Sequence, residues 1–172
     1  MLANLKSSLW TQFGATIDML RRAIEAMPED KWVEERRFYY TAFHTLSFLD
    51  YYLTNPPADF QGWLPFTLTD KDKLPPEALD DVIPSRNYSK QELLDYCAYC
   101  RNKAKTLIEG LTEETVNGRW IEYWNGQVDR DFSQLEILFY NMRHVAQHVG
   151  QLNQRIRELT GKSAGWLSWA EA

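Results

Sequence analysis

The chain contains three histidines, and their positions are suited to binding one metal ion. His144 and His148 are four residues apart, so on a helix their side chains project from the same face, about 6 Å apart at Cβ. Two neutral imidazoles placed in this way can share a divalent cation, and a third imidazole leaves one or more positions open for water or substrate. His44 is the remaining histidine, and we expect it to complete the metal site.

The same three residues also have a less specific interpretation. An H-x-x-x-H pair is by itself more often a pair of surface or core histidines, and His44 alone is more often a hydrogen-bonded core residue. The metal site is favoured because all three histidines fall on helix faces that we expect to point into a bundle. Nickel and zinc both suit imidazole ligands, with iron and copper as alternatives. A dinuclear carboxylate site would need Glu-x-x-His on two helices, and the pattern is missing.

Polar side chains accompany the histidines on the same predicted helix faces. Tyr40 and Tyr51 lie on the predicted helix that carries His44, and Asn141 and Gln151 lie on the one that carries the other two histidines. Polar groups beside a core seam need hydrogen-bond partners, so these residues could orient the imidazoles or contact a ligand. We take all four as candidates for steering a substrate, while the catalytic residue itself is not determined by the sequence.

Four segments with helical periodicity would position these residues. In each segment apolar side chains recur at spacings of three and four, which places them on one face of an α-helix. Ser89 with Glu92, and Ser133 with Glu136, have the spacing of capping boxes at the beginning of the third and fourth helices. We therefore predict an all-α four-helix bundle that forms a single domain over 1–172. The predicted helices run over about 4–27, 35–54, 89–111 and 133–160.

The connections between these helices predict the directions in which they run. Residues 55–88 contain six of the seven prolines, and a connection of this length can cross the whole bundle before the next helix begins. We expect an up-down-down-up arrangement, with this long proline-rich crossover between the second and third helices serving as a cover for the site. Asn125-Gly126, between aromatic and β-branched residues, indicates a small hairpin between the third and fourth helices.

The bulk composition argues against several classes of partner. A net charge of −5 and an isoelectric point of about 5.2 argue against a nucleic-acid-binding protein and against electrostatic anchoring to a membrane. The N-terminus lacks the continuous apolar stretch of a signal peptide, and no segment approaches the length of a membrane span. We therefore predict a cytoplasmic protein with no nucleic-acid and no membrane partner. Cys97 and Cys100 share the apolar face of the third predicted helix, where buried thiols are favoured over a redox pair.

Several motifs recur together along the chain: a histidine midway along the second helix, the run RHVAQHVGQLN at 143–153, MPEDKW at 27–32, the proline-rich crossover and a tail containing tryptophan. In their order and spacing they resemble the DinB-like (DinB/YfiT) superfamily over essentially the whole chain. The resemblance implies a four-helix bundle with a three-histidine site for nickel or zinc, matched here by His44, His144 and His148. It also implies a homodimer, because members of the family are frequently dimeric.

The activity implied by the resemblance is less specific. Characterised relatives include thiol-dependent transferases and isomerases that use bacillithiol, mycothiol or glutathione, which implies a low-molecular-weight thiol as cofactor and a small-molecule substrate. A metal ion held by three imidazoles lowers the pKa of a bound water or thiol, so the main hypothesis is a metal-dependent thiol transferase or hydrolase. The alternative is a bundle that binds a metal or a small ligand without catalysis, as a stress-response protein or structural dimer.

Overall fold

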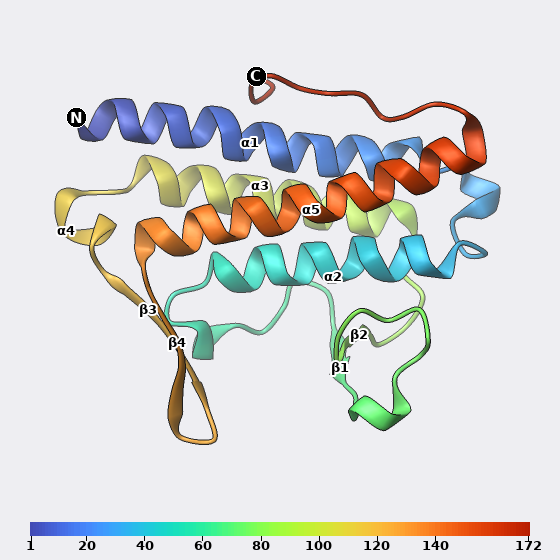
Figure 1. Cartoon of the computed structure of the whole chain (residues 1–172), viewed down its shortest axis with the longest axis horizontal. Coiled ribbons are helices and arrows are strands. Elements are labelled where there is room, and N and C mark those ends of the chain that lie inside the picture. Colours follow the sequence, from blue (N-terminus) through green and yellow to red (C-terminus); the bar gives the residue numbers. More distant parts are fainter.

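Four long helices lie side by side in the computed structural model, which describes residues 1–172 (Figure 1). In Figure 1, α1 and α5 run in one direction along the long axis, and α2 and α3 run in the opposite direction. Helices α1 and α2 each pack against both α3 and α5, so the two helices that carry the histidines, α2 and α5, are neighbours. The four helices are α1 (Leu2–Ala26), α2 (Arg36–Tyr52), α3 (Lys90–Glu109) and α5 (Gln134–Thr160).

The prediction of an all-α four-helix bundle is wrong, because the chain also contains a fifth helix and two small antiparallel sheets. The fold is therefore mixed α/β. The hairpin expected at Asn125-Gly126 is present as β3 and β4. The strands β1 and β2 escaped prediction because they have three residues each, too few to show the alternation that marks a strand. The additional elements are α4 (Glu113–Val116), the pair β1 (Phe66–Leu68) and β2 (Val82–Pro84), and the pair β3 (Arg119–Trp124) and β4 (Gln127–Ser133).

A two-residue turn joins β3 to β4 in a hairpin that extends away from the long helices (Figure 1). Asn125 and Gly126 form the turn with φ angles of 50° and 77°, a left-handed backbone conformation that these two residue types tolerate best. Trp120 on β3 is fully buried, and its Nε1 donates to the carbonyl oxygen of Thr54 at 2.8 Å. The base of the hairpin is thereby attached to the chain just after α2.

The proline-rich crossover is folded against α2 and contains β1, β2 and the short 3₁₀ turns Pro57–Asp59 and Lys71–Lys73. At its end, the backbone N–H of Tyr88 donates to the hydroxyl of Tyr39 at 2.9 Å. The indole Nε1 of Trp32 donates to the carbonyl oxygen of Tyr88 at 3.0 Å. These bonds fix the segment that leads into α3 against the beginning of α2.

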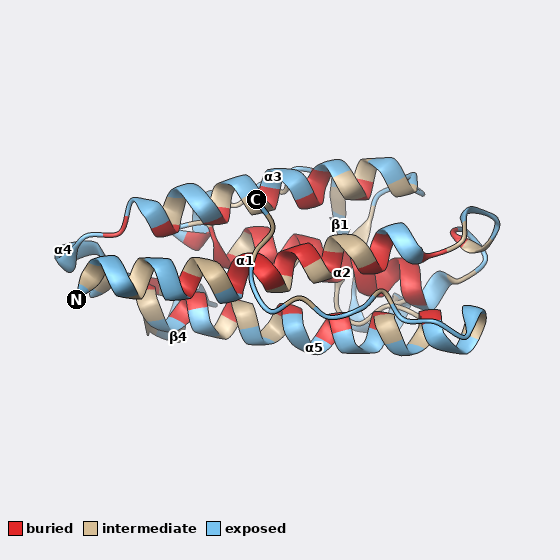
Figure 2. Ribbon diagram, turned by 90° about the horizontal axis from the view of Figure 1, so that it is seen from above, coloured by how far each residue is buried: buried red, intermediate tan, exposed pale blue.

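Apolar side chains of the long helices form a continuous core, and Figure 2 shows the buried residues along the inward faces of the helices. Cys97 and Cys100 are free thiols buried within this core, which confirms the prediction of buried thiols. None of the helices combines the length and the apolar character needed to cross a membrane. Fully buried core residues include Phe13, Ile17, Leu20 and Ile24 of α1, Phe43, Leu46 and Leu49 of α2, Leu93 and Ala104 of α3, and Leu138 and Val145 of α5.

Both capping boxes expected from the sequence are present. The hydroxyl oxygen of Ser89 accepts from the backbone N–H of Glu92 at 3.2 Å, and Ser133 accepts from the backbone N–H of Glu136 at 3.2 Å. Each bond satisfies a backbone donor that has no partner within the first helical turn. The caps define where α3 and α5 begin, and through α5 they set the position of two of the three histidines.

An ion pair between Asp50 and Lys103, in which the carboxylate is buried, joins α2 to α3. Asp50 is 3% exposed, and its Oδ1 accepts from Nζ of Lys103 at 2.6 Å. Its Oδ2 accepts from the hydroxyl of Tyr96 at 3.0 Å. Lys103 also donates to the hydroxyl of Thr54 at 2.7 Å, so all members of the cluster are hydrogen-bonded. A buried charge is tolerated only with such partners, and we expect this cluster to fix the register of α2 against α3.

Candidate metal centre

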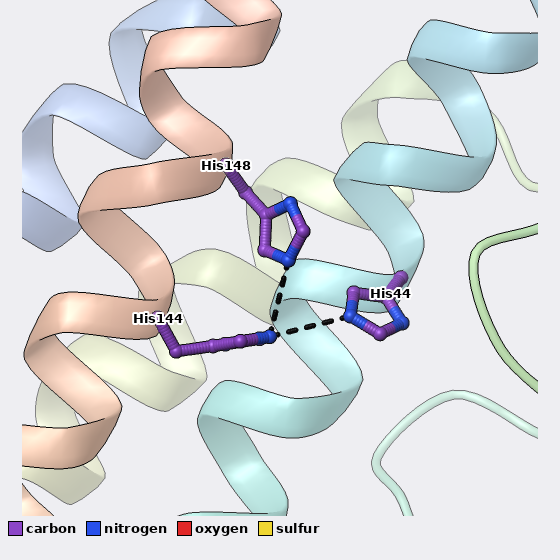
Figure 3. A group of neighbouring side chains, drawn as sticks. All are labelled: His44, His144 and His148. Carbon is purple, nitrogen blue, oxygen red and sulfur yellow. Dashed lines mark hydrogen bonds between the residues drawn. The ribbon is translucent and has the colours of Figure 1, made fainter.

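The side chains of His44 from α2 and of His144 and His148 from α5 meet between the two helices (Figure 3). Nε2 of His144 lies 3.2 Å from Nε2 of His44 and 3.1 Å from Nε2 of His148. One ring nitrogen of each histidine lies within 4.8 Å of the other two. The three residues that the sequence singled out therefore form one group that could hold a metal ion.

Two aromatic rings pack against this group, and two of its three imidazoles have little contact with solvent. His44 is 8% exposed and His148 is 7% exposed. The ring of Phe48 lies 4.5 Å from the ring of His44, and the ring of Tyr52 lies 5.7 Å from that of His144, measured between centroids. Few polar groups other than the imidazoles are available here, so electrostatic interactions are stronger than they would be in water.

Burial lowers the pKa of all three imidazoles. Desolvation, followed by the effect of His148, lowers the pKa of His44 to about 3. Desolvation, followed by the effects of the other two histidines, lowers the pKa of His144 to about 3. Desolvation also lowers the pKa of His148, although its hydrogen bond to Gln151 opposes the change. The rings are therefore neutral near pH 7, which is the state in which histidine binds metal.

Hydrogen bonding assigns the tautomer of His148. Its Nδ1 lies 2.7 Å from Oε1 of Gln151, and an amide oxygen can only accept, so Nδ1 carries the proton. Nε2 of His148 is then an unprotonated nitrogen with a free lone pair. In Figure 3 this nitrogen points at Nε2 of His144.

Hydrogen bonds among the three rings cannot satisfy the whole group. Nε2 of His144 has close contacts with two rings, yet a single ring nitrogen has either one proton or one lone pair. If Nε2 of His144 carries a proton directed at His148, its contact with His44 has no linear hydrogen bond. If Nε2 of His144 is unprotonated, its lone pair faces the lone pair of Nε2 of His148. Nδ1 of His44 and Nδ1 of His144 are also buried without any partner. A cation that accepts a lone pair from each Nε2 removes the conflict between the rings.

The donor set fits a borderline divalent ion. Two ligands of one tetrahedral zinc ion, each about 2.0–2.1 Å from the metal, lie about 3.3–3.4 Å apart. The two short separations between Nε2 atoms, 3.2 Å and 3.1 Å, are close to that value, so small movements of the rings would suffice. The group contains no cysteine or carboxylate, and three imidazoles leave a coordination position for water or another ligand.

Two of the four candidate polar residues lie on α5, and only one of them is hydrogen-bonded to a histidine. The amide oxygen of Gln151 accepts a hydrogen bond from Nδ1–H of His148, so Gln151 positions that ring and fixes its tautomer. Asn141 is fully buried, and its Nδ2 donates to the carbonyl oxygen of Leu49 at 2.9 Å. Asn141 therefore joins α5 to α2 and has no hydrogen bond to an imidazole.

The two candidate tyrosines on α2 are hydrogen-bonded to other residues. The hydroxyl of Tyr40 accepts from the guanidinium of Arg36 at 3.1 Å. The hydroxyl of Tyr51 donates to Oε1 of Glu122 at 2.5 Å, and Glu122 also pairs with Arg130 on the hairpin. Burial and the hydrogen bond to Glu122 raise the pKa of Tyr51. Neither hydroxyl is hydrogen-bonded to the metal-site histidines.

Sequence reasoning missed the aromatic wall of the site, and the segment that it predicted as a cover supplies no hydrogen bond and no ring contact to the three histidines. Phe48 follows His44 by four residues, so the helical spacing that paired the histidines could also have identified it. Tyr52 lies one turn farther along α2. The hydrogen bonds and ring contacts of the three histidines involve no residue of the crossover 55–88.

Comparison of the sequence with known protein families and with curated proteins finds no matching family model and no matching protein. The assignment of a function therefore depends on the geometry of the three histidines and on the residues that surround them.

Replacing Gln151 with leucine is expected to lower the affinity for zinc about 10- to 100-fold, because His148 would lose the acceptor that fixes its tautomer. Competition with a chromophoric chelator measures the affinity. Gln154→Leu is the matched control, since Gln154 lies on the same helix and donates to Glu158 instead of a histidine. An unchanged affinity in Gln151→Leu would show that Gln151 does not position the ring.

Proposed function

We propose that the chain binds one divalent metal ion through His44, His144 and His148 and uses it as an enzyme acting on a small molecule. The observation that carries this proposal is the convergence of three neutral imidazoles whose Nε2 atoms cannot all be satisfied by one another. Nickel or zinc is the expected ion, because both suit imidazole ligands. The resemblance of 143–153 to the DinB-like superfamily supports the same donor set.

The chemistry of the proposed reaction follows from the open coordination position. A divalent ion held by the three imidazoles would act as a Lewis acid. It would lower the pKa of a water or thiol bound at the open position, which suits hydrolysis or thiol transfer. Gln151 holds the proton on Nδ1 of His148 and keeps Nε2 available as a ligand atom. The rings of Phe48 and Tyr52 pack against the imidazoles, and such apolar surroundings strengthen electrostatic interactions with a bound ion.

A non-catalytic role in metal or small-ligand binding is the second candidate, and the burial of the histidines favours it. His44 and His148 are less than a tenth exposed, and no metal-site histidine lines the polar cavity between α2 and α5. In this case the ion would stabilise the contact between α2 and α5 without reaching a substrate. Any ligand that binds only the folded state raises its stability, so both candidates predict a higher melting temperature with metal.

Cobalt substitution separates the two candidates. We expect the cobalt-loaded protein to develop a thiolate-to-cobalt absorption band when 2-mercaptoethanol is added, because the proposed enzyme has a coordination position open to a thiol. His44→Ala, loaded under the same conditions, is the control for cobalt bound elsewhere. A cobalt spectrum that responds to neither the thiol nor azide would contradict the proposed enzyme and favour the non-catalytic role.

A further inference from the structure

A cavity of about 690 Å³ lies beside the histidines, between the beginning of α2 and the C-terminal half of α5. Its volume is within the range of small-molecule sites, but only two of its eleven lining residues are hydrophobic. Gln151 belongs to its wall, and the same side chain bonds Nδ1 of His148. The cavity is therefore connected to the proposed metal centre through one residue, and its polar wall fits a polar ligand.

The charges that line this cavity are separated into two groups of opposite sign. Glu35, Arg155 and Glu158 form a connected group, in which Arg155 donates to both oxygens of Glu35 at 2.8 Å and 2.9 Å and to Glu158 at 3.1 Å. One guanidinium between two carboxylates leaves this group with a formal charge of −1. Arg37 is the remaining charged residue of the wall and makes no ion pair. A cation is favoured beside the first group and an anion beside the second.

Donor atoms on the wall remain available to a ligand. The one hydrogen bond of the Arg37 guanidinium is a contact of 3.4 Å between its Nη1 and the carbonyl oxygen of Pro76. A guanidinium has five N–H donors and matches the two oxygens of a carboxylate. Gln151 uses only its amide oxygen for His148, so its amide nitrogen is free to donate. These donors could hold a carboxylate at the side of the cavity nearest to Arg37.

We propose that this cavity binds a small zwitterion of the amino-acid or short-peptide type. Its carboxylate would pair with Arg37, and its ammonium group would lie against Glu158 and Glu35. This inference rests on the proposed function, since it makes the zwitterion the substrate class of the metal centre. The amide nitrogen of Gln151 would contact the middle of the ligand, and the bond from Gln151 to His148 would place the ligand next to the site of reaction.

Three related dipeptides test each end of the ligand separately. Alanyl-alanine has both charges, its C-terminal amide lacks the carboxylate, and its N-acetyl derivative lacks the ammonium group. We expect isothermal titration calorimetry to show that each derivative binds at least about tenfold more weakly than alanyl-alanine, because each loses one charge-assisted hydrogen bond. Equal binding of all three, or no binding of alanyl-alanine, overturns the proposal.

Two variants assign the charges to their partners. Arg37→Gln is expected to remove the advantage of alanyl-alanine over its amide and to keep its advantage over the N-acetyl derivative. Glu158→Gln is expected to do the reverse. Arg143→Gln changes an exposed arginine of α5 outside the cavity and should alter neither ratio. If Arg37→Gln leaves both ratios at the parent values, the carboxylate does not bind at Arg37 and the proposal fails.

Failure of this proposal and failure of the metal site can be told apart. The titrations are made on chelator-treated protein as well as on zinc-loaded protein, and the zinc content of Arg37→Gln is measured by elemental analysis. Binding of alanyl-alanine to a chain that takes up no zinc supports the cavity and contradicts the metal centre. A chain that takes up zinc and does not bind alanyl-alanine contradicts the cavity alone.

Discussion

Replacing His148 with alanine is expected to reduce the affinity for zinc and nickel by more than about 100-fold. This loss exceeds the roughly 10- to 100-fold expected when a ligand only loses its hydrogen-bond partner, as in Gln151→Leu. The variant removes a ligand atom, and it also removes the ring whose tautomer is fixed by Gln151. The remaining two imidazoles come from different helices and would have to hold the ion alone. Competition with a chromophoric chelator on untagged protein measures the loss.

The matched control for this variant is Phe139→Ala. Phe139 lies on the same helix as His148, is 45% exposed and is not part of the histidine group. We expect its metal affinity to equal that of the parent. A His148→Ala variant that binds zinc as tightly as Phe139→Ala would mean that zinc binds elsewhere on the chain.

Replacing Asp50 with alanine is expected to lower the free energy of unfolding by about 3 kcal/mol. The variant leaves Lys103 without its carboxylate and the hydroxyl of Tyr96 without an acceptor, within a contact that joins α2 to α3. The side chain of Lys103 is 25% exposed, so part of the lost interaction is replaced by water, and the effect should fall toward the lower end for buried ion pairs. Urea denaturation followed by circular dichroism measures the change.

Asp70→Ala serves as the control for the effect of removing an ion pair as such. Asp70 pairs with Lys73 at 2.6 Å, but the side chains are 70% and 68% exposed, and exposed pairs contribute little. We expect a change within about 0.5 kcal/mol. If Asp50→Ala is no more destabilised than Asp70→Ala, the buried pair does not contribute to holding α2 against α3.

The long helices could be predicted because all four show strong helical periodicity, and α3 and α5 have a side-chain cap as a second, independent signal. Apolar residues such as Phe13 and Ile17 repeat with the helical period and are buried, and Ser89 and Ser133 supply side-chain caps where α3 and α5 begin. The observed ends of the four long helices lie within two residues of the predicted ones. Long segments of strong periodicity carry the most information about secondary structure, since each additional turn repeats the same pattern.

The small sheets could not be predicted in the same way. The pairing of β1 with β2 places residues such as Thr67 and Ile83 opposite each other, although they lie far apart in a proline-rich segment. Strands this short show no alternation of polar and apolar side chains. The predicted fold class was therefore wrong, although the four long helices were predicted correctly. The hairpin of β3 and β4 left a trace only at its turn, where Asn125-Gly126 has the residue types that a positive φ requires.

The parts of the candidate site that depend on spacing along one helix were predictable. His144 and His148 share a face because they are four residues apart, and Gln151 follows His148 by three residues and bonds to it. Asn141 shares the same stripe, yet its side chain reaches the carbonyl oxygen of Leu49, because the rotation of α5 places it against the backbone of α2. The partner of a buried amide depends on a neighbouring helix, and this information is absent from the spacing along one helix.

Elemental analysis of the untagged protein by inductively coupled plasma mass spectrometry, before and after incubation with zinc and nickel and removal of unbound ions, tests the central claim most directly. The geometry of His44, His144 and His148 predicts about one divalent ion per chain after incubation. A protein that contains no metal even after refilling with both ions would contradict the metal centre and leave the three histidines as a buried polar cluster between α2 and α5.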